Sequence, residues 1–179
     1  IKIKKGKEKI ISIFGKKTLE SINVVIPGDP SSAAFYTALT ILNKDSSLKI
    51  QKVGLNPTRI GFYELLKKNG TKIVFKNKKK NNNEIYGDIY IKSSKIKPIK
   101  ASEEYYVKAT DEYPILFVIS ALTKGMSTFK NIGGLKNKEA DRIKEMQKIL
   151  KQVGVKSILS KNELKIFGKG MINASDKKI

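Results

Sequence analysis

Two stretches of the sequence follow the same order of predicted elements, and this repeat limits the possible folds more than any other feature. Each stretch reads strand–helix–strand–helix–strand–strand, and the second follows the first after about 80 residues, the offset that separates Ser47 from Ser127. Repeated units of this kind bury their apolar faces against each other, and neither is stable alone. The sequence therefore predicts an α/β fold with two βαβαββ units around a shared core.

The first unit is predicted to open after the break Pro27-Gly28-Asp29-Pro30, with Ser31 and Ser32 as N-cap candidates for its first helix. The polar residues 76–84 are expected to form a mobile hairpin loop. The elements predicted for this unit are strands over residues 22–26, 48–53, 72–75 and 85–91 and helices over residues 33–43 and 58–68, with an earlier β-rich run at 10–14.

The second unit repeats this order around a Gly133-Gly134 turn. Its last helix carries one apolar face, because Ile143, Met146 and Leu150 recur at steps of three and four. The elements predicted for this unit are helices over residues 111–122 and 138–153 and strands over residues 127–132, 155–159 and 164–167.

The net charge of +21 arises from 37 lysines and arginines against 16 acidic residues. Such a charge attracts nucleic-acid phosphates. The lysines, however, are scattered along the whole chain, and the aromatic residues do not interleave with them as a base-stacking surface requires. We therefore expect no nucleic-acid partner. No run approaches the roughly 20 apolar residues that cross a bilayer, and no signal peptide opens the chain, so we expect no membrane partner and a cytoplasmic location.

The chain contains no cysteine and no histidine. The lack of cysteine excludes disulfides and thiolate metal sites, and the lack of histidine removes the usual general base and the commonest metal ligand. We therefore expect no metal and no cofactor. Any chemistry must use carboxylates, lysine, arginine and backbone N–H groups.

Only two of the basic residues are arginines, Arg59 and Arg142. Arginine offers a planar fork that grips a carboxylate or phosphate with two bonds, which lysine cannot do. Arg142 closes Lys138-Glu139-Ala140-Asp141-Arg142, where spacings of three and four residues would bring the charged side chains together on the first turn of a helix. A helix N-terminus also favours anions. The sequence leaves two interpretations open, an anion-handling active site or a charged turn with an internal salt bridge.

Asp111 lies in Thr110-Asp111-Glu112-Tyr113-Pro114 and opens a predicted apolar helix. In isolation it reads as an N-cap, but it could also accept a proton from a substrate hydroxyl, with Glu139 as a second carboxylate of different role. The turn Gly28-Asp29-Pro30-Ser31-Ser32 lacks the lysine of a P-loop, which favours a turn followed by a helix cap. The segment Asn56-Pro57-Thr58-Arg59 caps its helix or lies near a site.

Four segments in order resemble the 5-enolpyruvylshikimate-3-phosphate synthase family. They are Pro27-Gly28-Asp29-Pro30-Ser31-Ser32-Ala33-Ala34-Phe35, Val53-Gly54-Leu55-Asn56-Pro57-Thr58-Arg59, Asp111-Glu112-Tyr113-Pro114-Ile115-Leu116 and Lys138-Glu139-Ala140-Asp141-Arg142-Ile143. The resemblance implies an inside-out α/β barrel of the enolpyruvyl transferase type, with two domains of three βαβαββ units each. Residues 1–20 would end the other domain and form the hinge, and residues 21–96 and 97–179 would be two units of one domain whose third unit is missing.

The resemblance also implies the reaction, in which the enolpyruvyl group of phosphoenolpyruvate passes to the 5-hydroxyl of shikimate 3-phosphate. It implies no cofactor, these two small-molecule partners and a monomer. Asp111 would contact the shikimate hydroxyls and help to deprotonate the nucleophile, and Lys138 would stabilise charge beside that hydroxyl. Glu139 would be the acid–base group for the methylene carbon, and Arg142 would grip phosphoenolpyruvate.

The chain departs from the family pattern at Asn137, where an apolar residue is usual, and at Ala140, where serine or threonine is usual. A lysine–serine–arginine cluster, a serine-rich stretch and an Asp-His-Arg motif have no counterpart here. We therefore expect an internal fragment that is inactive alone. Two alternatives remain: a UDP-N-acetylglucosamine enolpyruvyl transferase of the same fold, and a basic non-enzymatic module that binds nucleic acid.

Overall fold

Helices and strands alternate through residues 2–5, 9–16 and 18–171, the part of the chain that the computed structural model describes. The strands are β1 (Lys2–Lys5), β2 (Lys9–Ser12), β3 (Ser47–Gly54), β4 (Lys72–Asn81), β5 (Glu84–Lys92), β6 (Lys100–Ala101), β7 (Gly125–Phe129), β8 (Lys156–Ser160) and β9 (Glu163–Gly168). The helices are α1 (Pro30–Leu42), α2 (Gly61–Lys68), α3 (Glu103–Lys108), α4 (Tyr113–Ala121) and α5 (Arg142–Gln152), with 3-10 turns η1 (Thr110–Glu112) and η2 (Gly133–Asn137).

The two units have the same sheet topology. In the second unit, β6 pairs in parallel with β7, and β9 and β8 follow in antiparallel order. In the first unit, the order is β3-β5-β4, and a single parallel bridge from Gly28 to Val53 takes the place that β6 has in the second. The predicted repeat of two βαβαββ units is therefore confirmed.

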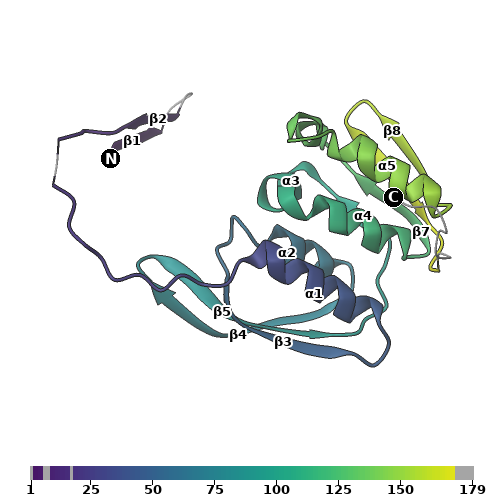
Figure 1. Ribbon diagram of the computed structural model, residues 1–179, viewed down its shortest axis with the longest axis horizontal. Helices are drawn as coiled ribbons and strands as arrows, with labels where there is room; N and C mark the ends of the chain where they lie inside the picture. Colours follow the sequence, from purple (N-terminus) through teal and green to yellow (C-terminus); the bar gives the residue numbers. More distant parts are fainter. Residues whose placement is uncertain (1, 6–8, 17, 172–179) are drawn as a thin grey trace.

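Figure 1 shows the helices of the two units facing each other between two outer sheets. Helix α1 packs on β3 and β5, α4 packs on β9, and α1 and α4 contact each other. The buried side chains of both units form one core. Its largest fully buried members are Phe62, Tyr63, Leu65, Leu66, Ile89, Ile91, Ile99, Tyr113, Leu116, Phe117, Ile119 and Phe129. The helices of each unit are covered in part by those of the other, which favours stabilisation of the two units through one shared core.

The N-terminal segment runs away from the two units, and the β1–β2 hairpin lies apart from them (Figure 1). The prediction of a strand over residues 22–26 is wrong: these residues are exposed and pair with no strand of the described chain. A β-branched run favours a strand only where a partner is present to pack against. In the described ranges 2–5, 9–16 and 18–171, no helix has both the length and the apolar character to cross a bilayer.

The loop predicted over residues 76–84 is also wrong, because most of it is strand. Strand β4 continues to Asn81 and strand β5 begins at Glu84, so the turn between them is only Asn82-Asn83. Both asparagines have positive φ, of 45° and 67°. A two-residue hairpin needs this conformation, and asparagine tolerates it well. The lysine-rich composition of this segment thus indicates an exposed hairpin rather than a loop.

Helix starts differ from their predicted positions for a common reason. Asp29, not Ser31 or Ser32, caps α1, because its carboxylate accepts the N–H groups of both serines at 3.2 and 2.9 Å. Before α2, the Asn56 side chain accepts the Thr58 N–H at 3.0 Å and forms a turn, so that this helix begins at Gly61. Short polar side chains compete with the helix for backbone N–H groups and thereby set where it begins.

Candidate active site

Two adjacent carboxylates at the start of α4 face different environments. Asp111 and Glu112 end η1, where successive side chains point about 120° apart. The Asp111 side chain is 50% exposed, whereas Glu112 is buried, with 4% of its surface exposed. Neither side chain caps a helix. The N-cap interpretation of Asp111 is therefore wrong, and its oxygens are available to partners from other elements.

Asp111 meets two cations, Lys138 from the segment before α5 and Arg142 from the first residue of α5. Lys138 Nζ lies 3.7 Å from Asp111 Oδ1, and Arg142 Nη1 donates to the same oxygen at 3.3 Å. Arg142 Nη2 donates to Glu139 Oε2 at 2.9 Å. The four residues that the sequence singled out thus form one connected group, although Asp111 and Arg142 are 31 residues apart. The Glu139–Arg142 salt bridge exists, but it is part of a larger cluster joining two helix starts.

The segment that carries Lys138 and Glu139 is not helical, contrary to the prediction. Asp141 caps α5 by accepting the Lys144 N–H at 3.0 Å, so that Arg142 is the first helical residue. Lys138 and Glu139 reach the cluster from a bent, non-helical segment between η2 and α5. In η2, a Cβ atom at Gly134 would collide with the Tyr106 hydroxyl. Glycine thus lets this segment lie directly against the Tyr106 side chain.

The charges of the cluster stabilise Glu139 as a carboxylate. Hydrogen bonds from its own backbone N–H and from Arg142 lower the pKa of Glu139, and the bond with Glu139 raises the pKa of Arg142. Burial raises the pKa of the neighbouring Tyr106 hydroxyl. In this state Glu139 is ionised, and it holds a proton more readily once Arg142 is drawn away from it.

The first unit contains a second polar cluster at an equivalent place. Arg59 Nη2 donates to Ser31 Oγ at 3.1 Å and lies 3.7 Å from Asp29 Oδ1. The Ser31 hydroxyl in turn donates to the buried Glu112 carboxylate. In each unit an arginine at the second helix thus reaches an aspartate at the start of the first helix, and the two sets lie about 80 residues apart.

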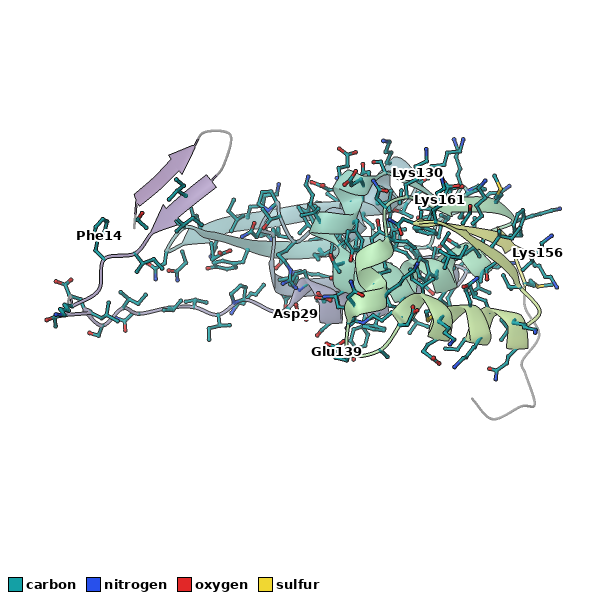
Figure 2. The ribbon with its side chains drawn as sticks, turned by 90° about the horizontal axis from the view of Figure 1, so that it is seen from above. Phe14, Asp29, Lys130, Glu139, Lys156 and Lys161 are labelled. Atoms are coloured by element: carbon teal, nitrogen blue, oxygen red, sulfur yellow. The ribbon has the colours of Figure 1, made fainter. Side chains whose placement is uncertain are left out.

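Sequence reasoning missed the roles of Ser31 and Glu112. The local pattern indicates a helix cap at Ser31 and only a neighbour of Asp111 at Glu112, but a side-chain hydrogen bond joins the two across 81 residues. The repeat held a usable signal, since it places the starts of α1 and α4 at equivalent positions. Figure 2 shows the labelled Asp29 and Glu139 on the part of the molecule toward the N-terminal segment, where α1 begins.

The described ranges contain no group of three or more acidic residues that could hold a metal ion. The polar atoms of the cluster are instead two carboxylates, a guanidinium and an ammonium group, all partly exposed. Such an arrangement can bind an anionic substrate and exchange protons with it.

The sequence model of one family, EPSP synthase (3-phosphoshikimate 1-carboxyvinyltransferase), matches residues 1–176. The chain belongs to the EPSP synthase family. The 3-phosphoshikimate 1-carboxyvinyltransferase of Zymomonas mobilis is 40% identical over 147 residues, which are 82% of this chain and 32% of that protein. The enzyme of the same name from Clostridium tetani is 39% identical over 151 residues, 84% of this chain and 34% of that protein.

A solved EPSP synthase from Acinetobacter baumannii has the same fold, with a TM-score of 0.84 and 33% identity over 97% of this chain and 39% of that one. The predicted enolpyruvyl transferase fold is therefore confirmed. The chain spans about a third of the length of the curated relatives it matches. The names of these relatives favour the EPSP synthase interpretation over both alternatives, the UDP-N-acetylglucosamine transferase and the basic nucleic-acid module.

Proposed function

We propose that the protein containing this chain transfers the enolpyruvyl group of phosphoenolpyruvate to the 5-hydroxyl of shikimate 3-phosphate. The observation that carries the proposal is the joining of Asp111, Lys138, Glu139 and Arg142 in one cluster, within a chain of the EPSP synthase family. Both substrates are multiply anionic. The lysine and arginine of the cluster supply the complementary charge.

The hydroxyl oxygen attacks C2 of phosphoenolpyruvate as its proton leaves, and C3 gains a proton. The tetrahedral adduct then loses phosphate and one C3 proton, which leaves the enol ether. Asp111 is half exposed and 3.7 Å from Lys138, which suits a carboxylate that accepts the hydroxyl proton beside a stabilising cation. The 81% exposed Glu139 side chain can reach a bound ligand and serve C3.

Arg142 couples phosphoenolpyruvate binding to proton transfer in this proposal. The fork of Arg142 is divided between Asp111 and Glu139. A phosphoenolpyruvate anion that takes over the fork would release Glu139, whose pKa then rises toward its ordinary value. This rise enlarges the protonated fraction of Glu139 that can give its proton to C3.

We also propose that residues 21–96 and 97–179 are two of three units in one domain, and that residues 1–20 end the other domain. The exposed side chains of Phe35 and Leu39, both 63%, and Tyr36, 62%, form an apolar row on α1. A row of this kind on a helix between two sheets favours cover by a further unit. A cytoplasmic location and a monomeric state also stay predictions.

The test is phosphate release by the full-length protein from phosphoenolpyruvate with shikimate 3-phosphate as acceptor. Glu139→Gln should lower kcat by about a hundredfold or more, because a preorganised acid–base group is lost. Glu145→Gln is the matched control, since that glutamate lies on α5, which follows Glu139 in the chain, in an exposed pair with Lys148. Release only with UDP-N-acetylglucosamine would overturn the assigned acceptor, and normal turnover of Glu139→Gln would overturn the role of that residue.

A further inference from the structure

We propose that Arg59, Ser31 and Glu112 form a link that positions Asp111 for the reaction, an inference that rests on the proposed function. Arg59 and Ser31 belong to the first unit and Glu112 to the second, where it is bonded through the backbone to Asp111. The link therefore joins the scaffold of one unit to the site of the other.

The hydroxyl of Ser31 is the centre of the link. It donates to Glu112 Oε1 and accepts from Arg59 Nη2 at 3.1 Å. Its position is fixed by the main chain, because the Ser31 N–H is bonded to the capping carboxylate of Asp29 at 3.2 Å. Arg59 is fixed in turn by Asp29, 3.7 Å away. A helix cap and an ion pair thus hold one hydroxyl in a defined place.

Glu112 cannot easily leave this hydroxyl. It is 4% exposed, and burial raises the pKa of its carboxyl while the hydrogen bond from Ser31 opposes that effect. A buried carboxyl that loses its donor bears the desolvation cost without compensation. The hydrogen bond therefore holds the start of α4 against the start of α1.

The residues that flank Asp111 and Glu112 in the chain transmit this constraint to Asp111. On one side, the Thr110 hydroxyl donates to the Tyr106 carbonyl at 2.6 Å. On the other, the buried Tyr113 ring packs edge-on against Phe117 and Phe129. With its neighbours fixed, Asp111 has little freedom to move away from Lys138 and Arg142.

Glu112 acts through Asp111 rather than on the substrate, because its buried carboxyl is directed toward Ser31 and not toward the exposed cluster. A displaced catalytic group can cost up to about a hundredfold in rate, even when the altered residue is remote from the chemistry. Removal of the link is therefore expected to change the kinetic constants of the enzyme and not only its stability.

The experiment uses the full-length protein and compares Ser31→Ala with Ser32→Ala. Ser32 is a matched control, because its hydroxyl donates to Asp29 Oδ2 at 2.8 Å within the same turn instead of to Glu112. Ser31→Ala should lower kcat/KM for shikimate 3-phosphate about tenfold, whereas Ser32→Ala should change it less than about twofold. Glu112→Gln can accept the same hydrogen bond and should retain more activity than Glu112→Ala.

A double-mutant cycle with Asp111→Asn separates positioning from a merely structural role. If Ser31 acts through Asp111, Ser31→Ala should lower kcat/KM by less than about twofold in a protein that already carries Asp111→Asn. An equal cost in both backgrounds, or a Ser31→Ala variant with wild-type kcat/KM, would overturn the link. A wild-type protein without transfer activity would instead overturn the proposed function itself. If Glu112→Ala does not fold, the comparison of Ser31→Ala with Ser32→Ala still tests whether the link positions Asp111.

Discussion

The two units place an arginine and an aspartate in the same arrangement but use them differently. In the first unit the oxygens of Asp29 are engaged by the Ser31 and Ser32 N–H groups, and Arg59 adds a distant ion pair. In the second, Asp111 caps no helix and receives both Lys138 and Arg142. Freeing one carboxylate from its capping role is what converts a helix start into a candidate site.

Replacing each arginine by lysine tests this difference most strongly. Arg142→Lys should lower kcat/KM about a hundredfold, because a point charge cannot bridge Asp111 and Glu139 or grip phosphoenolpyruvate with two bonds. Arg59→Lys should lower kcat/KM only about tenfold, since it weakens the contact with Ser31 but leaves the proposed substrate contacts of Arg142 intact. Steady-state kinetics of the full-length variants measure both. Equal losses would show that the two clusters do not differ in function.

The charge state of Glu139 offers a sharper test of the second cluster. Because hydrogen bonds and Arg142 lower its pKa, its carboxyl should titrate below the ordinary glutamate range in the free protein. Removal of the guanidinium in Arg142→Gln should move the midpoint upward, and so should bound phosphoenolpyruvate. Carbon-13 NMR of labelled glutamate carboxyls measures this midpoint in a pH titration, and the signal missing from Glu139→Gln identifies Glu139. A Glu139 midpoint that stays the same after both Arg142→Gln and the addition of phosphoenolpyruvate would contradict the proposed coupling.

The two caps should show the smallest effect. Asp29 accepts two backbone N–H groups and a hydroxyl, whereas Asp141 accepts one N–H, so Asp29→Ala should be the more destabilising, by about 1 to 2 kcal/mol against about 1 kcal/mol. Thermal unfolding of the full-length variants measures the difference.

The Asp29 cap also predicts a pH dependence. Partial burial raises the pKa of Asp29, but hydrogen bonds from Ser32 and Ser31 outweigh it and leave the pKa below its ordinary value. The stabilisation is therefore present above the ordinary aspartate range and is lost as pH falls through the lower folded-state pKa. Asp29→Asn, which keeps the cap without the charge, should be less sensitive to acid. A stronger acid sensitivity would contradict this assignment.

The features that the sequence predicted correctly are those that depend on local residue patterns. Turn residues and apolar periodicity identified the repeat, and the motif at residues 138–142 identified the charged cluster. Its geometry was wrong, because the Asp141 side chain begins α5 later than the charge pattern indicated. The bond between Ser31 and Glu112 depends on how α1 and α4 pack against each other, which neither local segment encodes.

The adjacency of Asp111 and Glu112 also bears on how this protein can evolve. One peptide bond joins Asp111, the proposed catalytic carboxylate, to the buried Glu112, within a turn of three residues. Each side chain can be exchanged separately, but an insertion or deletion between them would rotate one out of the core or the other out of the cluster. Variation in length should therefore be absorbed elsewhere, for instance at the Asn82-Asn83 hairpin tip, while this turn keeps its length across the family.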